Sequence, residues 1–379
     1  MSALADHIAA MPLVDHHCHG LMPGDLTREQ FESLITESHA PHHRSHFDAP
    51  FGLMVRSLCA ELLGLDRHCS PDAYLTRRAE LGAAQVARIL LDTSGISDYL
   101  LDSGYQGSAI TSVRQFADLA DRPCFEILRL EALAEQVAPT SSASTFADDF
   151  RRALDERAAD SLGFKSIIAY RFGLDFDPHP PSDHEVTRAA DEWLAACAQT
   201  GRYRLDHEVL LRFGLFTCLE YRKPVQLHIG FGDSDIELNR CDPSHLSRFL
   251  RHTESSGARF TLLHCYPFIR EAGILSHVFP HVFLDIGLTL NYLGPSAERA
   301  MAQALEVAPF GKQLFSSDAF GLPELYACGA LLWRGALAKV LDSWVADDWL
   351  SEEDAITYAD WMGQGNARVL YGLADQVTP

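Results

Sequence analysis

The chain has 379 residues, 47% of them hydrophobic and 22% charged, and its formal net charge at pH 7 is −21. This composition is typical of a soluble globular protein, and the acidic balance argues against nucleic-acid binding, which needs a basic surface. No apolar stretch is long enough to cross a bilayer and no signal peptide is evident, so we expect no membrane contact and a cytoplasmic location. Nine scattered cysteines without a Cys-x-x-Cys pair indicate reduced thiols that pack as small hydrophobic residues.

Short apolar runs alternate with longer helical patterns along most of the chain, as they do in proteins with a parallel sheet. The runs predict eight strands, at 11–17, 87–93, 124–130, 163–170, 224–229, 259–265, 281–287 and 313–318. The helical patterns lie at 143–160, 182–199, 204–222, 243–255, 295–308, 323–347 and 351–371. Eight strands followed by helices predict a (β/α)8 TIM barrel formed by a single domain, residues 1–379. A helical insertion at about 20–86 leaves the end of the first strand and should overhang the active-site mouth.

Residues that commonly bind metal ions lie at the ends of four of these strands. His17 and His19 alternate on the first strand and can share one face, whereas His16 and Cys18 would face away. Asp15 would share the ligand face at a deeper position. His228, His264 and Asp318 end the fifth, sixth and eighth strands, where barrel enzymes build their sites. Histidine nitrogens with one carboxylate suit Zn²⁺, with Mn²⁺ or Fe²⁺ as alternatives.

This order of residues resembles the amidohydrolase superfamily, whose pattern is Asp-x-His-x-His on strand one, His on strands five and six, and Asp on strand eight. Three further segments are similar to the amidohydrolase-related branch, and most of all to the amidohydrolase half of nodulin/glutamine-synthetase fusion proteins. These segments are Gly163-Phe-Lys-Ser-Ile-Ile-Ala-Tyr-Arg171, Gln226-Leu-His-Ile-Gly-Phe-Gly-Asp233 and Gly365-Asn-Ala-Arg-Val-Leu-Tyr371.

The resemblance implies that His17, His19, His228 and Asp318 bind one divalent metal ion. Asp318 would also act as the general base toward a metal-activated water. His264 would bind a second ion in a two-metal site; in a one-metal site it would contact the water or the substrate carbonyl. Lys165 is the candidate for bridging two ions. It follows Phe164 near the predicted strand start, however, so we expect it at the barrel floor in a buried ion pair, and one metal ion is favoured.

Substrate contacts are expected from Tyr170 and Arg171 at the end of the fourth strand and from Arg129 at the end of the third. Arginine is well suited to bind a carboxylate. Arg171 could instead pair with Asp175 or Glu131, and Arg129 with Glu131.

Four weaker candidates complete the sequence-based set. Asp92 could orient a ligand histidine or cap a helix, and Asn291 and Tyr292 could line the pocket. The histidine cluster in the insertion is predicted to be a solvated loop rather than a metal site; its members are His39, His42, His43 and His46.

The leading functional hypothesis is an amidohydrolase, a hydrolase of C–N bonds other than peptide bonds, acting on a small carboxylate-bearing substrate. The resemblance suggests γ-glutamyl amides. Alternatives are non-oxidative decarboxylation of an aromatic or enol acid, a lactonase, and a barrel that serves only as a scaffold. Neither nucleic acid nor membrane is expected as a partner, and a homo-oligomer is left open.

Overall fold

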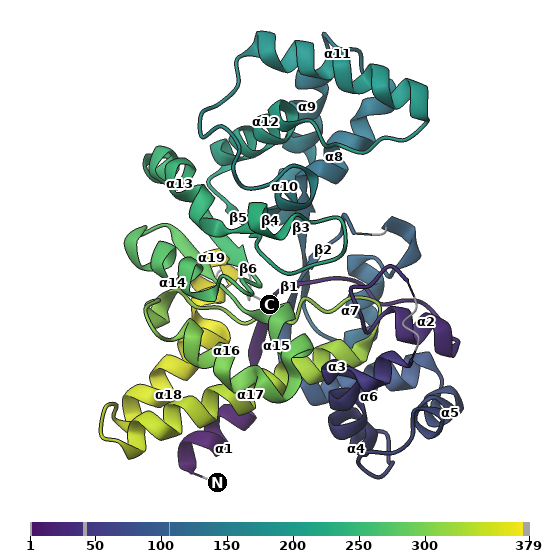
Figure 1. Cartoon of the computed structure of the whole chain (residues 1–379), viewed down its shortest axis with the longest axis vertical. Coiled ribbons are helices and arrows are strands. Elements are labelled where there is room, and N and C mark those ends of the chain that lie inside the picture. The colour runs from purple at the N-terminus through teal and green to yellow at the C-terminus, as the bar shows by residue number, and fades with distance from the viewer. Residues whose placement is uncertain (1, 41–43, 106, 374–379) are drawn as a thin grey trace.

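The computed structural model describes residues 2–40, 44–105 and 107–373, and its centre is a curled, seven-stranded parallel sheet (Figure 1). The strands are hydrogen-bonded in chain order, and each is connected to the next by helical segments. Their bounds are β1 Leu13–Cys18, β2 Ile96–Asp102, β3 Cys124–Arg129, β4 Ser161–Ser166, β5 Pro224–His228, β6 Arg259–Leu263 and β7 Val282–Leu284.

The eighth position of the barrel holds an irregular segment in place of the strand predicted at 313–318. This segment still joins both edges of the sheet: the Leu314 amide donates to the Leu284 carbonyl at 3.0 Å, and the His16 amide donates to the Phe315 carbonyl at 3.2 Å. Because β7 and β1 are connected through it, the sheet closes into a TIM-barrel-like fold. The predicted (β/α)8 class is confirmed, whereas the prediction of a regular eighth strand is wrong.

The helices cover the outside of the sheet, with α2–α6 gathered at one end of the molecule and α8–α12 at the other (Figure 1). The helices before β2 in the chain are α1 Ala3–Ala10, α2 Arg28–Ser33, α3 Pro50–Met54, α4 Ala60–Leu62, α5 Pro71–Leu81 and α6 Ala83–Ser94. Those between β2 and β6 are α7 Val113–Ala120, α8 Leu130–Val137, α9 Phe146–Ala158, α10 Ile168–Arg171, α11 Asp183–Thr200, α12 Glu208–Cys218 and α13 Ser247–Thr253. Those after β6 are α14 Ile269–Val278, α15 Gly287–Leu293, α16 Ala297–Ala304, α17 Pro323–Ala346, α18 Glu352–Asp360 and α19 Asn366–Tyr371. None of these helices combines the length and the hydrophobicity needed to span a membrane.

The second strand lies later in the chain than predicted. Residues 87–93 belong to α6, where Val86 and Leu90 are buried at the four-residue spacing of a helix face. Gly95 adopts the left-handed conformation that ends the helix, and β2 begins directly after it. The helical segment between β1 and β2 is therefore longer than expected.

Strict alternation fails in β1, because its pairing with β2 shifts register between Asp15 and Cys18. Such a bulge inserts one extra residue and changes which side chains share a face. The prediction that His16 faces away from His17 is wrong, since both side chains contact the amide of Gln226.

A second, small core is separate from the main one and contains residues of the strands together with the last helix. Val14, Leu100 and Ile127 pack there with Leu370 and Tyr371 of α19. The last helix therefore contacts the same strands whose ends carry the candidate site.

Candidate metal centre

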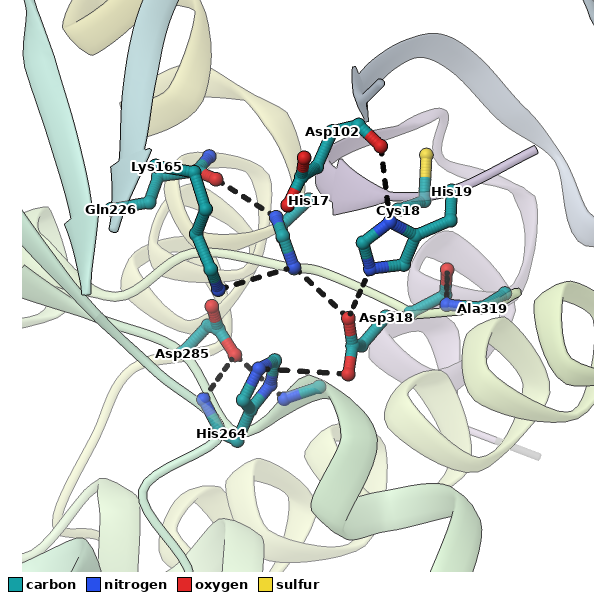
Figure 2. Close-up of polar contacts among 12 residues, drawn as sticks. His17, Cys18, His19, Asp102, Lys165, Gln226, His264, Asp285, Asp318 and Ala319 are labelled. Atoms are coloured by element: carbon teal, nitrogen blue, oxygen red, sulfur yellow. Dashed lines mark hydrogen bonds and ion pairs between the residues drawn. The ribbon is translucent and has the colours of Figure 1, made fainter. Parts of the chain in front are cut away.

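Three of the predicted histidines surround the carboxylate of Asp318 (Figure 2). Nε2 of His17 and Nε2 of His19 lie 3.0 and 3.2 Å from Oδ1 of Asp318. Nε2 of His264 lies 3.5 Å from Oδ2. All four side chains are buried, so the structure brings together ligand-type atoms from β1, the end of β6 and the eighth segment.

His228, at the end of β5, completes the cluster. Its ring centroid is 4.8 Å from that of His264, and its Nε2 is buried without a hydrogen-bond partner among the described residues. A buried nitrogen left unpaired costs free energy unless something else binds it. Imidazole nitrogens and a carboxylate are the donor set of Zn²⁺ sites, so these residues fit a divalent metal ion. The ligand roles of His17, His19, His228 and Asp318 stay a prediction.

Two of the histidines are held by hydrogen bonds on the far side of their rings. Nδ1 of His17 lies 2.8 Å from Oε1 of Gln226, and Nδ1 of His19 lies 3.1 Å from the Asp102 carbonyl oxygen. Both acceptors require a proton on Nδ1, which leaves the Nε2 lone pair directed at the centre of the cluster.

Sequence reasoning did not find Asp102, because the second strand was placed too early. The last residue of β2 is Asp102, whose carboxylate oxygen also lies within 4.8 Å of ligand atoms of His17 and His19. Asp92, the residue predicted to have this orienting role or to cap a helix, lies exposed on α6 and pairs with Arg122 at 3.3 Å.

The protonation states suit a cation. Burial and the positive charge of Lys165 lower the pKa of His17 to about 3, so its ring is neutral at physiological pH. Burial alone would raise the pKa of Asp318, but the neighbouring imidazoles of His264 and His17 hold it well below its usual value. Neutral imidazoles and an ionised carboxylate are the forms that bind metal ions.

The backbone is strained at two residues of the cluster. His264 and Asp318 have φ angles of +70° and +47°, a region that non-glycine residues rarely adopt. The carboxylate of Asp285 accepts hydrogen bonds from the His264 amide at 3.0 Å and the Gly287 amide at 2.8 Å. The carboxylate of Asp15 accepts from the amide and the hydroxyl of Ser317 at 2.9 and 2.5 Å. Strain of this kind persists only where the surroundings fix it, and it is concentrated at functional sites.

Lys165 lies at the cluster and not at the barrel floor. Its Nζ is 3.5 Å from Nε2 of His17, and burial lowers the pKa of the Lys165 amine to about 8. The predicted location is wrong because β4 begins at Ser161, so Lys165 is the fifth of six strand residues and its long side chain reaches the ligand level. No carboxylate lies within ion-pair distance of Nζ among the described residues, so the expected buried ion pair is also absent there.

A cavity of about 630 Å³ opens above the cluster. It is lined by the five candidate ligands and by all three of the predicted substrate contacts, Arg129, Tyr170 and Arg171. The cavity therefore gives a small molecule access to the ligand atoms.

Arg129 is fixed by Asp102. Its Nε and Nη2 lie 3.0 and 2.5 Å from Oδ2 of that carboxylate, and its guanidinium covers the ring of Tyr105 at 5.6 Å. The alternative pairing with Glu131 is wrong, because Glu131 instead accepts from the Ser166 hydroxyl and the Ile167 amide.

Tyr170 and Arg171 follow β4 on the short helix α10, since the strand ends at Ser166 rather than at 170. Arg171 pairs with Glu135, with Nη1 to Oε1 at 3.1 Å, so the alternatives Asp175 and Glu131 are both wrong. The Tyr170 ring lies 4.4 Å from the ring of His228.

Five charged residues that line this cavity were missed by the sequence reasoning, namely Glu37, Arg202, Arg204, Asp233 and Asp235. None of them ends a predicted strand: Glu37 lies in the helical insertion, and Arg204 is the first residue of the helical pattern at 204–222. The loop that carries the two arginines is anchored, because the Leu205 amide donates to Glu135 at 2.8 Å and the Arg204 carbonyl accepts from Trp193 at 2.8 Å.

The remaining candidates are not among the residues that line the cavity. Asn291 is buried and donates to the Ser317 and Leu325 carbonyls, so its role is structural. The Tyr292 hydroxyl donates to Glu37 at 2.9 Å. In the histidine cluster of the insertion, His39 is exposed and His46 half-buried, while His42 and His43 lie outside the described residues.

Comparisons with known proteins place this fold and site in context. No protein-family profile matches the chain. It is 27% identical over 414 residues to protein fluG of Emericella nidulans; the match covers 99% of the chain but 47% of that protein, so the chain spans about half the length of this curated relative.

A solved structure from Lactobacillus casei ATCC 334, provisionally assigned as a metal-dependent hydrolase, matches with a TM-score of 0.85 and 26% identity over 100% of both chains. A uronate isomerase from Thermotoga maritima matches with a TM-score of 0.64 and 12% identity, over 97% of this chain and 96% of the other. Glucuronate isomerase from Caulobacter crescentus matches with a TM-score of 0.65 and 12% identity, over 99% of this chain and 95% of the other. The two isomerases show the fold alone. Together the matches support an amidohydrolase-like TIM barrel over the whole chain, while the specific branch stays a prediction.

Proposed function

We propose that the chain is a metal-dependent hydrolase of the amidohydrolase superfamily that cleaves an amide of a small, carboxylate-bearing substrate. The observation that carries this proposal is the convergence of three buried histidines on Asp318, beside a fourth, His228, whose Nε2 has no hydrogen-bond partner in the described part of the chain. The hydrolase-like neighbour from Lactobacillus casei supports the class of reaction. A γ-glutamyl amide is our candidate substrate.

His17, His19, His228 and Asp318 would hold one divalent ion, with Zn²⁺ first and Mn²⁺ or Fe²⁺ as alternatives. When bound, such an ion lowers the pKa of a coordinated water toward neutrality and polarises a substrate carbonyl. Asp318 presents one oxygen to His17 and His19 and the other toward His264. Its second oxygen can therefore accept the proton that the attacking water loses, as a general base. His264, on the opposite side of the carboxylate, would contact the substrate carbonyl as charge develops on it.

The charge of the cavity supports an acidic substrate. Although the whole chain carries a net charge of −21, five cationic side chains line the cavity, namely Arg129, Lys165, Arg171, Arg202 and Arg204. The carboxylates of the lining are Glu37, Asp233, Asp235 and Asp318, and Asp235 pairs with Arg204 at 3.0 Å. Arg129 and Arg171 are held rigidly by Asp102 and Glu135. Rigid guanidinium groups are pre-organised for a carboxylate, so less entropy is lost on binding.

The first experiment is elemental analysis of the purified protein, combined with thermal unfolding with and without Zn²⁺, Mn²⁺ and Fe²⁺. We expect about one ion per chain and stabilisation by about 2.7 kcal/mol when the ion is present at a hundred times its Kd. His228→Ala should lose that stabilisation, and His184→Ala, on the exposed face of α11, should keep it. Absence of both bound ion and stabilisation would overturn the proposal.

The second experiment distinguishes the reactions. The metal-loaded protein is assayed on N-acyl amino acids and γ-glutamyl amides for amine release, on lactones for ring opening, and on aromatic acids for CO₂. Amine release supports the proposal. CO₂ release or lactone opening alone would replace it with the decarboxylase or lactonase alternative, and no turnover by a metal-loaded protein would favour a scaffold.

A further inference from the structure

The last helix of the chain reaches the underside of the candidate metal centre through Tyr371. The Tyr371 hydroxyl lies 2.9 Å from Nε2 of Gln226 and 3.1 Å from Nδ1 of His16. All three side chains are buried. Neither the proposed metal ligands nor the cavity lining includes Tyr371, so its polar contacts need a separate explanation.

The hydrogen bonds of Gln226 allow a single orientation of its amide. Its Nε2 is the group that lies 2.7 Å from the His16 carbonyl oxygen and 2.9 Å from the Tyr371 oxygen. A carbonyl oxygen can only accept, so the Gln226 nitrogen must face His16 and Tyr371. Its oxygen Oε1 must then face the ring of His17, 2.8 Å from Nδ1 (Figure 2). An amide oxygen also only accepts, and His17 therefore carries its proton on Nδ1 and keeps the Nε2 lone pair for a cation.

The same hydroxyl continues the network toward β7. Because Tyr371 accepts from Gln226, its own proton is free to be donated to Nδ1 of His16. Nε2 of His16 then donates to Oδ2 of Asp285 at 2.9 Å. The other oxygen of Asp285 accepts from the amide of the strained residue His264 at 3.0 Å. One hydroxyl thus lies between two chains of hydrogen bonds that end at different residues of the cluster.

We propose that Tyr371 is a positioning residue: together with the His16 carbonyl it holds the Gln226 amide, and through Gln226 it supports the Nδ1–H tautomer and the ring orientation of His17, and with them the affinity for the divalent ion. The part that concerns affinity rests on the proposed function, in which His17 binds the ion. The part that concerns the tautomer rests on the Gln226 oxygen that faces Nδ1 of His17, and it competes with the Asp318 carboxylate that faces Nε2 of the same ring at 3.0 Å.

The test compares Tyr371→Phe with Tyr358→Phe in the full chain. Tyr358 is a matched control because its ring packs against Phe310 and Trp361 and no hydrogen bond of its hydroxyl is seen among the described residues. Removing a group that supports a metal ligand costs 10–100-fold in metal affinity in comparable sites. We therefore expect Tyr371→Phe to weaken Zn²⁺ binding by about 10–100-fold and Tyr358→Phe to leave it unchanged. Equal affinities of the two variants would overturn the proposal.

The tautomer is measured directly by ¹⁵N NMR of histidine-labelled, metal-free protein, with His17→Ala identifying the resonances. The wild type should show Nδ1–H at His17, and Tyr371→Phe should show a mixture with Nε2–H. An unchanged spectrum would contradict the role of Tyr371. A wild-type protein that has the expected tautomer but binds no ion would contradict the proposed function and leave this positioning role intact.

Gln226→Leu separates positioning from packing of the last helix, and it replaces the comparison if Tyr371→Phe does not fold. If Tyr371 acts through Gln226, adding Tyr371→Phe to Gln226→Leu produces no further loss of Zn²⁺ affinity. Multiplied losses in the double variant would show that Tyr371 acts independently, against the proposal. Gln226→Leu alone should convert His17 to a tautomer mixture, and a retained Nδ1–H form there would also refute it.

Discussion

A buried ion pair holds the helices between β1 and β2 against the barrel, and breaking it should destabilise the protein. Nε of Arg78 on α5 lies 2.8 Å from Oε1 of Glu324 on α17, with 6% and 0% of the two side chains exposed. The Tyr74 hydroxyl donates to the same oxygen at 3.0 Å. Arg78→Leu would leave the Glu324 carboxylate buried without its cation, a change that costs about 3–5 kcal/mol. Unfolding entropy of about 2.1 cal/mol/K per residue amounts to roughly 0.8 kcal/mol/K for a chain of this length, so Tm should fall by about 4–6 °C.

Differential scanning calorimetry on two further variants checks the physical reason. Arg88→Leu replaces an exposed arginine of the adjacent helix α6 and should change stability by less than about 0.5 kcal/mol. The double variant Arg78→Leu/Glu324→Leu removes both charges and should recover most of the loss, because no buried charge is left unpaired. The reasoning is refuted if Arg78→Leu and Arg88→Leu have the same Tm, or if the double variant is less stable than Arg78→Leu alone.

Burial raises the pKa of Glu37 at the cavity mouth from 4.5 to about 7. The folded protein therefore holds this proton more tightly than the unfolded chain, and the contribution of Glu37 to stability falls as pH rises through that window, which urea unfolding at several pH values would show. Above pH 7 the carboxylate repels an anionic substrate, so KM should rise there in the wild type and stay flat in Glu37→Gln; parallel KM profiles would argue against this charge effect. At Gly232 a Cβ would lie 2.0 Å from the Tyr170 hydroxyl oxygen, so Gly232→Ala should displace the Tyr170 ring and lower kcat/KM. An unchanged kcat/KM in this variant would contradict the prediction. Gly335→Ala, with open space on α17, should instead stabilise by about 0.5–1 kcal/mol in the same calorimetric assay, and a loss of stability would contradict this.

The sequence predicts the barrel and the members of the cluster because both depend on local patterns. His228 ends β5 and His264 directly follows β6, each after an apolar run, and parallel strands in a barrel bring such ends together. Asp102 was missed for a local reason as well. The apolar face of α6 resembles a strand over seven residues, so the second strand was predicted at 87–93, before its actual position at Ile96–Asp102. Periodicity alone does not separate a short buried strand from a buried helix turn.

Other features of the site depend on contacts that no local pattern shows. His16 and His17 both contact Gln226 because β1 is bulged where it pairs with β2. Lys165 reaches the cluster through the length of its side chain, which strand position alone does not predict. Arg204 lies on the loop between α11 and α12, which is anchored by Trp193, and no strand ends in this part of the sequence.

The irregular eighth segment and the strained backbone of Asp318 are one feature. A regular parallel strand has φ near −120°, whereas Asp318 has +47°, so the regular strand geometry is interrupted at this residue, although its amide still donates to the His17 carbonyl at 3.1 Å. The segment remains bonded to β1 on both sides of the irregularity, from the His16 amide to the Phe315 carbonyl and from the His19 amide to the Ala319 carbonyl. Between these bonds, the carboxylate of Asp15 accepts the Ser317 amide that a neighbouring strand would otherwise bind. The barrel therefore forgoes a regular eighth strand at the point where the Asp318 carboxylate meets histidines from β1 and β6.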